Sequence, residues 1–187
     1  MKGLLEVIEK RRARRALSDK PIAEDVVKRL MTAATYAPSC SNKQPWRFVA
    51  VTGEEARGKV RDALLGGNYW ARKAPLFVLA ATKPDLDCQL EDRRDYAFFD
   101  VGQAIMSLQY QAIHEGLYAH PIAGFKDVQL KESFDIPDEY VLLGLVVIGY
   151  PGDGADLNDK HKESERSERS RKDQSEVVSF DSWSFNA

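Results

Sequence analysis

Apolar residues recur along the chain in patterns that predict both helices and strands. Helical spacing runs through residues 24–36, with acidic residues in the first turn, and a short amphipathic helix is expected over residues 4–12. Residues 46–52 predict a strand, and residues 54–65 predict a helix that ends at Gly66 and Gly67. Helices and strands therefore mix along the chain.

The most apolar segments predict the centre of the fold. Residues 76–82 are apolar on both faces and residues 141–148 are also apolar, as expected of strands in the middle of a covered sheet. Residues 96–115 form the strongest predicted helix, which Gly116 ends. Its apolar side chains spread over more than one face, so we expect it to be buried in the core or against a second subunit.

The character of the chain changes after Pro151. Residues 153–176 hold many charges and almost no large apolar side chains, so they cannot form a core of their own. Residues 177–180, with Trp183 and Phe185, predict a terminal strand that docks on other structure. The elements do not alternate regularly, which favours an α+β fold around a central sheet. We expect one domain, residues 1–187, with residues 153–187 as an extended C-terminal arm.

Composition limits the class of protein. The 187 residues are 43% hydrophobic and 30% charged, as in a globular domain, and no apolar run reaches the roughly 20 residues that span a bilayer. The N-terminus lacks a signal-peptide core, so a cytoplasmic protein without membrane contact is expected. Cys40 and Cys88 lie in unrelated contexts and indicate neither a disulfide framework nor a metal site.

Two basic clusters stand out against a net charge of −2. Five of the six residues at positions 10–15 are basic, and a second group includes Arg169 and Arg171. Small clusters on a near-neutral protein favour a compact anion such as a phosphate, which converging guanidinium groups bind through paired donors. On a helical turn Arg11 and Arg15 would share a face. The alternative is a solvated basic end of a helix.

Several motifs follow one another in an order that resembles the nitroreductase family. These segments are RRARRALSDKPI at 11–22, APSCSNKQPW at 37–46, DVGQA at 100–104 with Gly116-Leu117, PIAGF at 121–125 and IGYP at 148–151. The resemblance covers nearly the whole chain. It implies a nitroreductase-like fold with a mostly antiparallel central sheet flanked by helices. It also implies a homodimer that exchanges its C-terminal arms and binds FMN at the interface.

The resemblance assigns the flavin phosphate to the first basic cluster. Arg11, Arg12 and Arg15 are expected there, with the backbone N–H of Ala13, where the family usually has a serine. Arg169 and Arg171 resemble the basic pair that closes over the phosphate late in the family's chains. The nitrogen N5 of the flavin is expected beside the backbone of Ile122, Ala123 and Gly124, where a glycine permits close approach. Asn68 is a further candidate contact.

The loop at residues 38–44 suits the pyrimidine edge of a flavin. That edge presents acceptors and an N–H, and the side chains of Asn42 and Gln44 can both donate and accept. A loop rich in Asn, Ser and Pro is otherwise an ordinary turn. The resemblance implies that Pro38, Ser39 and Asn42 reach the flavin of the other subunit and that Gln44 lies near the ring. Cys40 belongs to the same loop, and nothing nearby marks it as a nucleophile.

No other catalytic or metal motif competes with this interpretation. The three histidines lack metal-ligand spacing, and no Gly-x-Gly-x-x-Gly follows a strand, which disfavours a dedicated nicotinamide domain. We therefore expect NADH or NADPH to bind transiently and pass hydride through FMN N5 to a nitroaromatic, quinone or enone in a ping-pong reaction. Phe125, Tyr69 and Trp70 are candidate walls of the substrate pocket.

Two alternatives remain open from the sequence. One is a flavin-binding or flavin-processing protein of the same fold that does not turn over NAD(P)H. The other is a small regulatory or nucleic-acid-binding module that uses the basic clusters. The acidic net charge and the lack of aromatic residues interleaved with those clusters argue against nucleic acid.

Overall fold

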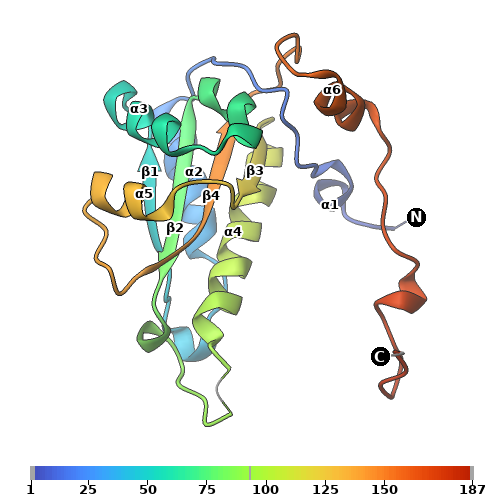
Figure 1. Ribbon diagram of the computed structural model, residues 1–187. Coiled ribbons are helices and arrows are strands. Elements are labelled where there is room, and N and C mark those ends of the chain that lie inside the picture. Colours follow the sequence, from blue (N-terminus) through green and yellow to red (C-terminus); the bar gives the residue numbers. More distant parts are fainter. Residues whose placement is uncertain (1–2, 93, 186–187) are drawn as a thin grey trace. The chain divides into compact units, whose positions relative to one another are not determined.

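The computed structural model describes residues 3–92 and 94–185. Four strands form one antiparallel sheet in the order β1-β2-β4-β3 (Figure 1). Their bounds are β1 Arg47–Val51, β2 Leu76–Thr82, β3 Tyr118–Ile122 and β4 Val141–Gly149. Every residue of β2 is buried, as its uniformly apolar sequence predicts for a central strand.

Helices cover both faces of the sheet, and the alternation of strand side chains decides which residues each helix meets. Leu76, Val78 and Val146 pack with α2 (Glu24–Thr35) and α4 (Tyr96–His114). Their neighbours Phe77 and Leu79 point to the other face. That face carries α3 (Glu54–Ala63), the 3₁₀ helix η2 (Gly66–Lys73) and α5 (Asp127–Ser133). The predicted α+β arrangement is confirmed.

Most predicted elements agree with the structure to within a few residues. The N-terminal helix α1 is only Glu6–Lys10, so the basic segment that follows is not helical. Neither α5 nor α6 (Asp159–Arg166) was predicted, because both are short and mostly polar. Short 3₁₀ turns also occur at Cys40–Asn42 (η1), Pro84–Leu86 (η3) and Gln174–Glu176 (η4). No helix of the described residues combines the length and apolarity needed to cross a membrane.

The chain divides into a compact unit that ends at Leu157 and a second unit that begins at Asn158. In the second unit, the Asn158 side chain caps α6 by accepting from His161 N at 2.9 Å, and Asp173 and Glu176 form a reciprocal cap on η4. Residues 177–180 are not a strand within this chain, and their predicted docking as a strand, for which a partner subunit was one candidate, stays a prediction. Strands need a hydrogen-bonding neighbour, and these residues pair with none of the described strands.

Candidate functional site

The basic segment after α1 is fastened to the end of β4. Leu17 is fully buried and forms an antiparallel bridge with Pro151. Ser18 N donates to Tyr150 O, and Gly152 N donates to Ala16 O, both at 2.8 Å. The expectation that Arg11 and Arg15 share a helical face was wrong, because α1 ends at Lys10. Their position is set instead by this pairing with the chain that leaves β4.

An aromatic stack supports Arg15. Its guanidinium carbon lies 5.9 Å from the centre of the Trp70 indole, a cation–π geometry, and the other partner of Trp70 is His120, with ring centres 4.7 Å apart. His120 Nδ1 donates to the Arg14 carbonyl oxygen at 3.1 Å. The stack therefore joins η2, β3 and the arginine segment. Trp70 is only 1% exposed, so the prediction that it lines an open substrate pocket was wrong.

Asn68 and Gly124, both predicted flavin contacts, are brought together across 56 residues of sequence. Asn68 Nδ2 donates to Gly124 O at 2.8 Å, and Leu65 N donates to the same carbonyl at 3.0 Å. A Cβ at Gly124 would lie 2.4 Å from Asn68 Nδ2, so an alanine there would displace the Asn68 side chain and break this hydrogen bond. The Ile122 side chain is in the core, while Ala123 is exposed. Ile122 can thus offer only its backbone to a ligand, as expected.

The loop at residues 38–44 has an unusual backbone conformation. Ser41, Asn42 and Gln44 have backbone φ values of 48°, 55° and 52°. These values lie in the left-handed region, which residues other than glycine rarely adopt. Gln44 N donates to Ser39 Oγ at 2.9 Å, and Gln44 Nε2 lies 3.3 Å from both oxygens of Asn42. Asn42 and Gln44 are exposed, so their amide groups can reach a ligand outside the compact unit.

The two cysteines are paired, which corrects the expectation drawn from their sequence context. Cys40 and Cys88 form a disulfide with Cα atoms 6.1 Å apart and a sequence separation of 48. The bridge ties the loop at residues 38–44 to the segment that follows β2. No local sequence pattern predicts this pairing. The two cysteines meet because the fold brings the end of β2 and the loop to the same end of the sheet.

Two buried carboxyl groups, those of Asp100 and Asp87, accept hydrogen bonds from the backbone of the two cysteines. Asp100 of α4 accepts from Cys40 N at 2.7 Å and from Gln103 Nε2 at 3.0 Å. Asp87 accepts from Cys88 N at 2.7 Å through Oδ1, while no described residue donates to its buried Oδ2. Burial raises the pKa of the Asp87 carboxyl above its usual range, and the neighbouring Asp100 carboxyl raises it further.

The arginine segment and the loop lie at opposite ends of the sheet. The arginine segment pairs with Pro151, just past the Gly149 end of β4. The loop lies at the other end, beside the pair Thr82 and Val141, where Thr82 Oγ1 donates to Pro45 O at 2.8 Å. At about 3.3 Å per residue, β4 alone spans roughly 26 Å. One copy of the chain therefore presents two separated parts of the predicted flavin site.

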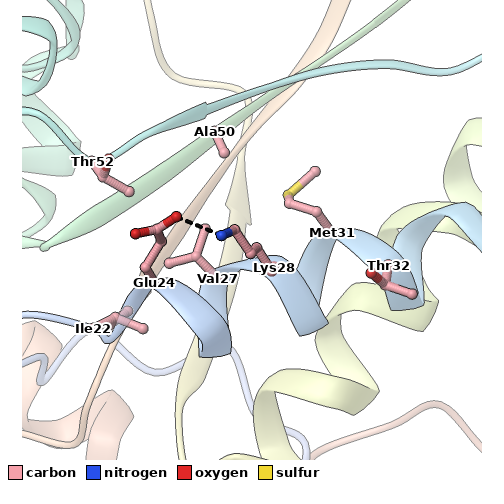
Figure 2. A pocket seen from close by; sticks show the side chains of 8 residues that line it. All are labelled: Ile22, Glu24, Val27, Lys28, Met31, Thr32, Ala50 and Thr52. Carbon is pink, nitrogen blue, oxygen red and sulfur yellow. Dashed lines mark ion pairs between the residues drawn. The ribbon is translucent and has the colours of Figure 1, made fainter.

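Two hollows lie on the surface of the compact unit. One of about 460 Å³ is lined by Pro38, Ser39 and Cys40 of the loop and by the first turns of α4. Another, of about 830 Å³, lies between α2 and the edge strand β1 (Figure 2) and contains none of the residues predicted to bind flavin. Its lining residues are Ile22, Glu24, Val27, Lys28, Met31, Thr32, Ala50 and Thr52. The first hollow fits the sequence prediction and the second does not.

Arg169 and Arg171 belong to the second unit. Arg171 is exposed and donates from Nη1 to Ser170 O at 2.6 Å, and Arg169 is partly buried. Their predicted contact with the phosphate stays a prediction.

Several known proteins are similar to this chain over most of its length. A protein of Archaeoglobus fulgidus, provisionally named an NADH dehydrogenase/NAD(P)H nitroreductase, is 28% identical over 84% of this chain and 90% of its own length. The FMN reductase [NAD(P)H] of Bacillus subtilis is 27% identical over 82% of this chain and 68% of its own. A crystal structure described as an oxidoreductase containing FMN superposes with a TM-score of 0.87 at 27% identity, covering 100% of this chain and 96% of that one.

The family model for the nitroreductase family matches residues 8–82 and 62–150, which together include the arginine segment, the loop and the strand that precedes Gly124. The chain belongs to the nitroreductase family.

Proposed function

We propose that the protein is an FMN-dependent oxidoreductase that takes hydride from NADH or NADPH and reduces an electron-poor acceptor. One observation carries the proposal. The segments predicted for the phosphate and for the reactive edge of the ring are held together by η2 and β3, which supply Trp70 and His120 to the arginine segment and Asn68 to the Gly124 segment. Membership of the family and the names of the relatives support the same function.

The residues present suit FMN in their chemistry. Guanidinium groups at Arg11, Arg12 and Arg15 would hold the phosphate, and the Ala13 backbone N–H would add a donor. The exposed amides of Asn42 and Gln44 would bind the pyrimidine edge. FMN, when bound, supplies the hydride chemistry between the nicotinamide and a nitroaromatic, quinone or enone. The chain's own residues orient these partners and exclude water, and no side chain is required as acid or base.

The same proposal requires a homodimer. The loop and the arginine segment of one chain lie roughly 26 Å apart along β4, so a second copy would bring its own loop to the ring. Apolar side chains left exposed support such an interface: Phe99 on α4 is 58% exposed, and Phe180 and Trp183 of the arm are 78% and 82% exposed. We propose that the arms, residues 153–187, are exchanged between subunits. Light scattering at micromolar concentration tests this, and a monomer of about 21 kDa would refute it.

A binding experiment tests the cofactor assignment. FMN is titrated into the apoprotein and into the variants Arg15→Ala and Lys59→Ala. Loss of a charged contact with phosphate costs about 1.5–3 kcal/mol, so Arg15→Ala should weaken FMN binding roughly ten- to hundredfold. Lys59 lies on α3 in an exposed pair with Glu55, 3.9 Å away, and its substitution should leave FMN binding unchanged.

A kinetic experiment separates the two flavin functions. Stopped-flow mixing of the FMN-loaded protein with NADH or NADPH should bleach the flavin absorption, and an acceptor from a panel of nitroaromatics, quinones and enones should restore it. A protein that binds FMN but oxidises neither nicotinamide would instead be a flavin-binding or flavin-processing protein. A colourless protein that takes up no FMN contradicts both.

A further inference from the structure

The Cys40–Cys88 disulfide anchors a strained loop. Three residues within 41–44 adopt left-handed backbone conformations without glycine, and such conformations persist only where surrounding structure supports them. The noncovalent support that reaches the loop from α4 is the bond from Cys40 N to Asp100 Oδ2 at 2.7 Å. The disulfide supplies a covalent anchor at the same residue. Loss of the disulfide would leave the loop free to relax.

The disulfide is placed where a thiol can reach it. Both cysteines are partly exposed, and Cys40 lines the 460 Å³ hollow with Arg94, Tyr96 and Phe99. Cys88 does not line that hollow. An incoming thiolate would therefore meet Cys40 Sγ, and the leaving thiol would be that of Cys88. Arg94 also lines the hollow, with its guanidinium paired to Asp92 at 2.7 Å.

The buried carboxyl pair opposes the closed arrangement once the bridge is gone. Asp100 holds the Cys40 backbone and Asp87 holds the Cys88 backbone, so the disulfide also keeps two carboxyl groups together. Burial, and then the nearby Asp100, raise the pKa of Asp87, which means that its ionised form is disfavoured in this arrangement. Separation of the two cysteines would relieve that cost by letting Asp87 reach water.

We propose that the Cys40–Cys88 disulfide is a redox modification site at which a dithiol reductant opens the bridge, loosens the loop at residues 38–44 and lowers the affinity for FMN. One reductant thiolate attacks Cys40 Sγ, and the Cys88 thiolate leaves and takes up a proton. The second reductant thiol then displaces Cys40 from the mixed disulfide. Two electrons pass from the dithiol to the protein, which ends with two thiols, while the reductant leaves as a disulfide. The effect on FMN rests on the proposed function, whereas the exchange itself does not.

The experiment uses the full-length protein in its oxidised and dithiothreitol-reduced forms, without denaturant. Thiols are counted by alkylation and mass spectrometry. Loop mobility is followed by trypsin cleavage after the exposed Lys43, and FMN affinity by flavin fluorescence. Reduction should expose two thiols, and cleavage at Lys43 should speed up. FMN affinity should fall about fivefold, the loss expected if the ordered loop is populated about one fifth of the time. Reoxidation should reverse all three changes.

The double variant Cys40→Ser/Cys88→Ser serves as the matched control, since it should behave as the reduced form and ignore dithiothreitol. Two thiols that are already free in the oxidised preparation would overturn the proposal. So would an unchanged cleavage rate at Lys43 after reduction. Cys40, Asp87 and Cys88 offer ligand atoms within 4.8 Å of one another. Retention of one zinc ion by the reduced protein would therefore also overturn it, because the metal would hold the loop. If neither form binds FMN while reduction still speeds cleavage, the proposed function fails and the redox site stands.

Discussion

Substitution of Gly152 by alanine tests how the arginine segment is held in place. A Cβ at this position would lie 2.5 Å from both the carbonyl carbon and oxygen of Leu17 and 2.9 Å from Ser18 N. All three are backbone atoms, so no side-chain rotation can relieve the contact. The segment that carries the arginines must move away from the chain leaving β4 by about 1 Å to reach ordinary contact distance.

The expected loss of stability follows from the hydrogen bonds and the apolar contacts that this movement disrupts. The bonds from Ser18 N to Tyr150 O and from Gly152 N to Ala16 O, both 2.8 Å, are worth about 1 kcal/mol each. Leu17 is fully buried, and truncation of such a residue costs about 2–5 kcal/mol, so partial withdrawal costs a fraction of that. We expect Gly152→Ala to lower the free energy of unfolding by about 3–5 kcal/mol.

Urea unfolding followed by tryptophan fluorescence measures this loss. Gly58→Ala is the matched control, since Gly58 lies within α3 and a Cβ there meets nothing within 4 Å. It should raise stability by about 0.5–1 kcal/mol through helix propensity. FMN affinity should fall in Gly152→Ala under conditions where the protein remains folded. A free energy of unfolding within about 0.5 kcal/mol of the parent would show that the segment is not held in this way.

Three further predictions follow from the same contacts. Cys88→Ser should lose about 4 kcal/mol of stability by the chain-entropy relation for a loop of this length, and a loss below about 1 kcal/mol in urea unfolding would contradict it. Because burial raises the pKa of Asp87, the stability it contributes is present below its ordinary pKa of 3.8 and declines as the pH rises through the folded-state value. Asp87→Asn should therefore be more stable than the parent at pH 8 but not at pH 3.5, and equal stability at pH 8 would refute this. Gly124→Ala should cost only about 1–2 kcal/mol, since Asn68 can rotate away and lose one hydrogen bond; a loss as large as that of Gly152→Ala would be inconsistent with a flexible side chain as the obstacle.

The centre of the fold could be predicted from the sequence because its signals are local. The apolar run at residues 76–82 matches β2 residue for residue, and the helix predicted at residues 96–115 matches α4 to within one residue. A segment that is apolar throughout must be buried on all sides, whatever surrounds it. The helix predicted at residues 4–12 is shorter in the structure, where α1 is Glu6–Lys10, and the chain beyond it is non-helical up to the bridge between Leu17 and Pro151.

For the candidate site too, some features could be predicted from the sequence and others depended on the tertiary structure. Motif order alone indicated the family, the loop at residues 38–44 and the Gly124 segment. Only the tertiary structure joined Cys40 to Cys88, placed Arg15 on the Trp70–His120 stack and set the loop and the arginine segment at opposite ends of β4. Contacts between residues 48 or more positions apart leave no periodic or spacing signal in a single sequence. They are decided when the sheet and its covering helices pack, which brings distant segments to the same place.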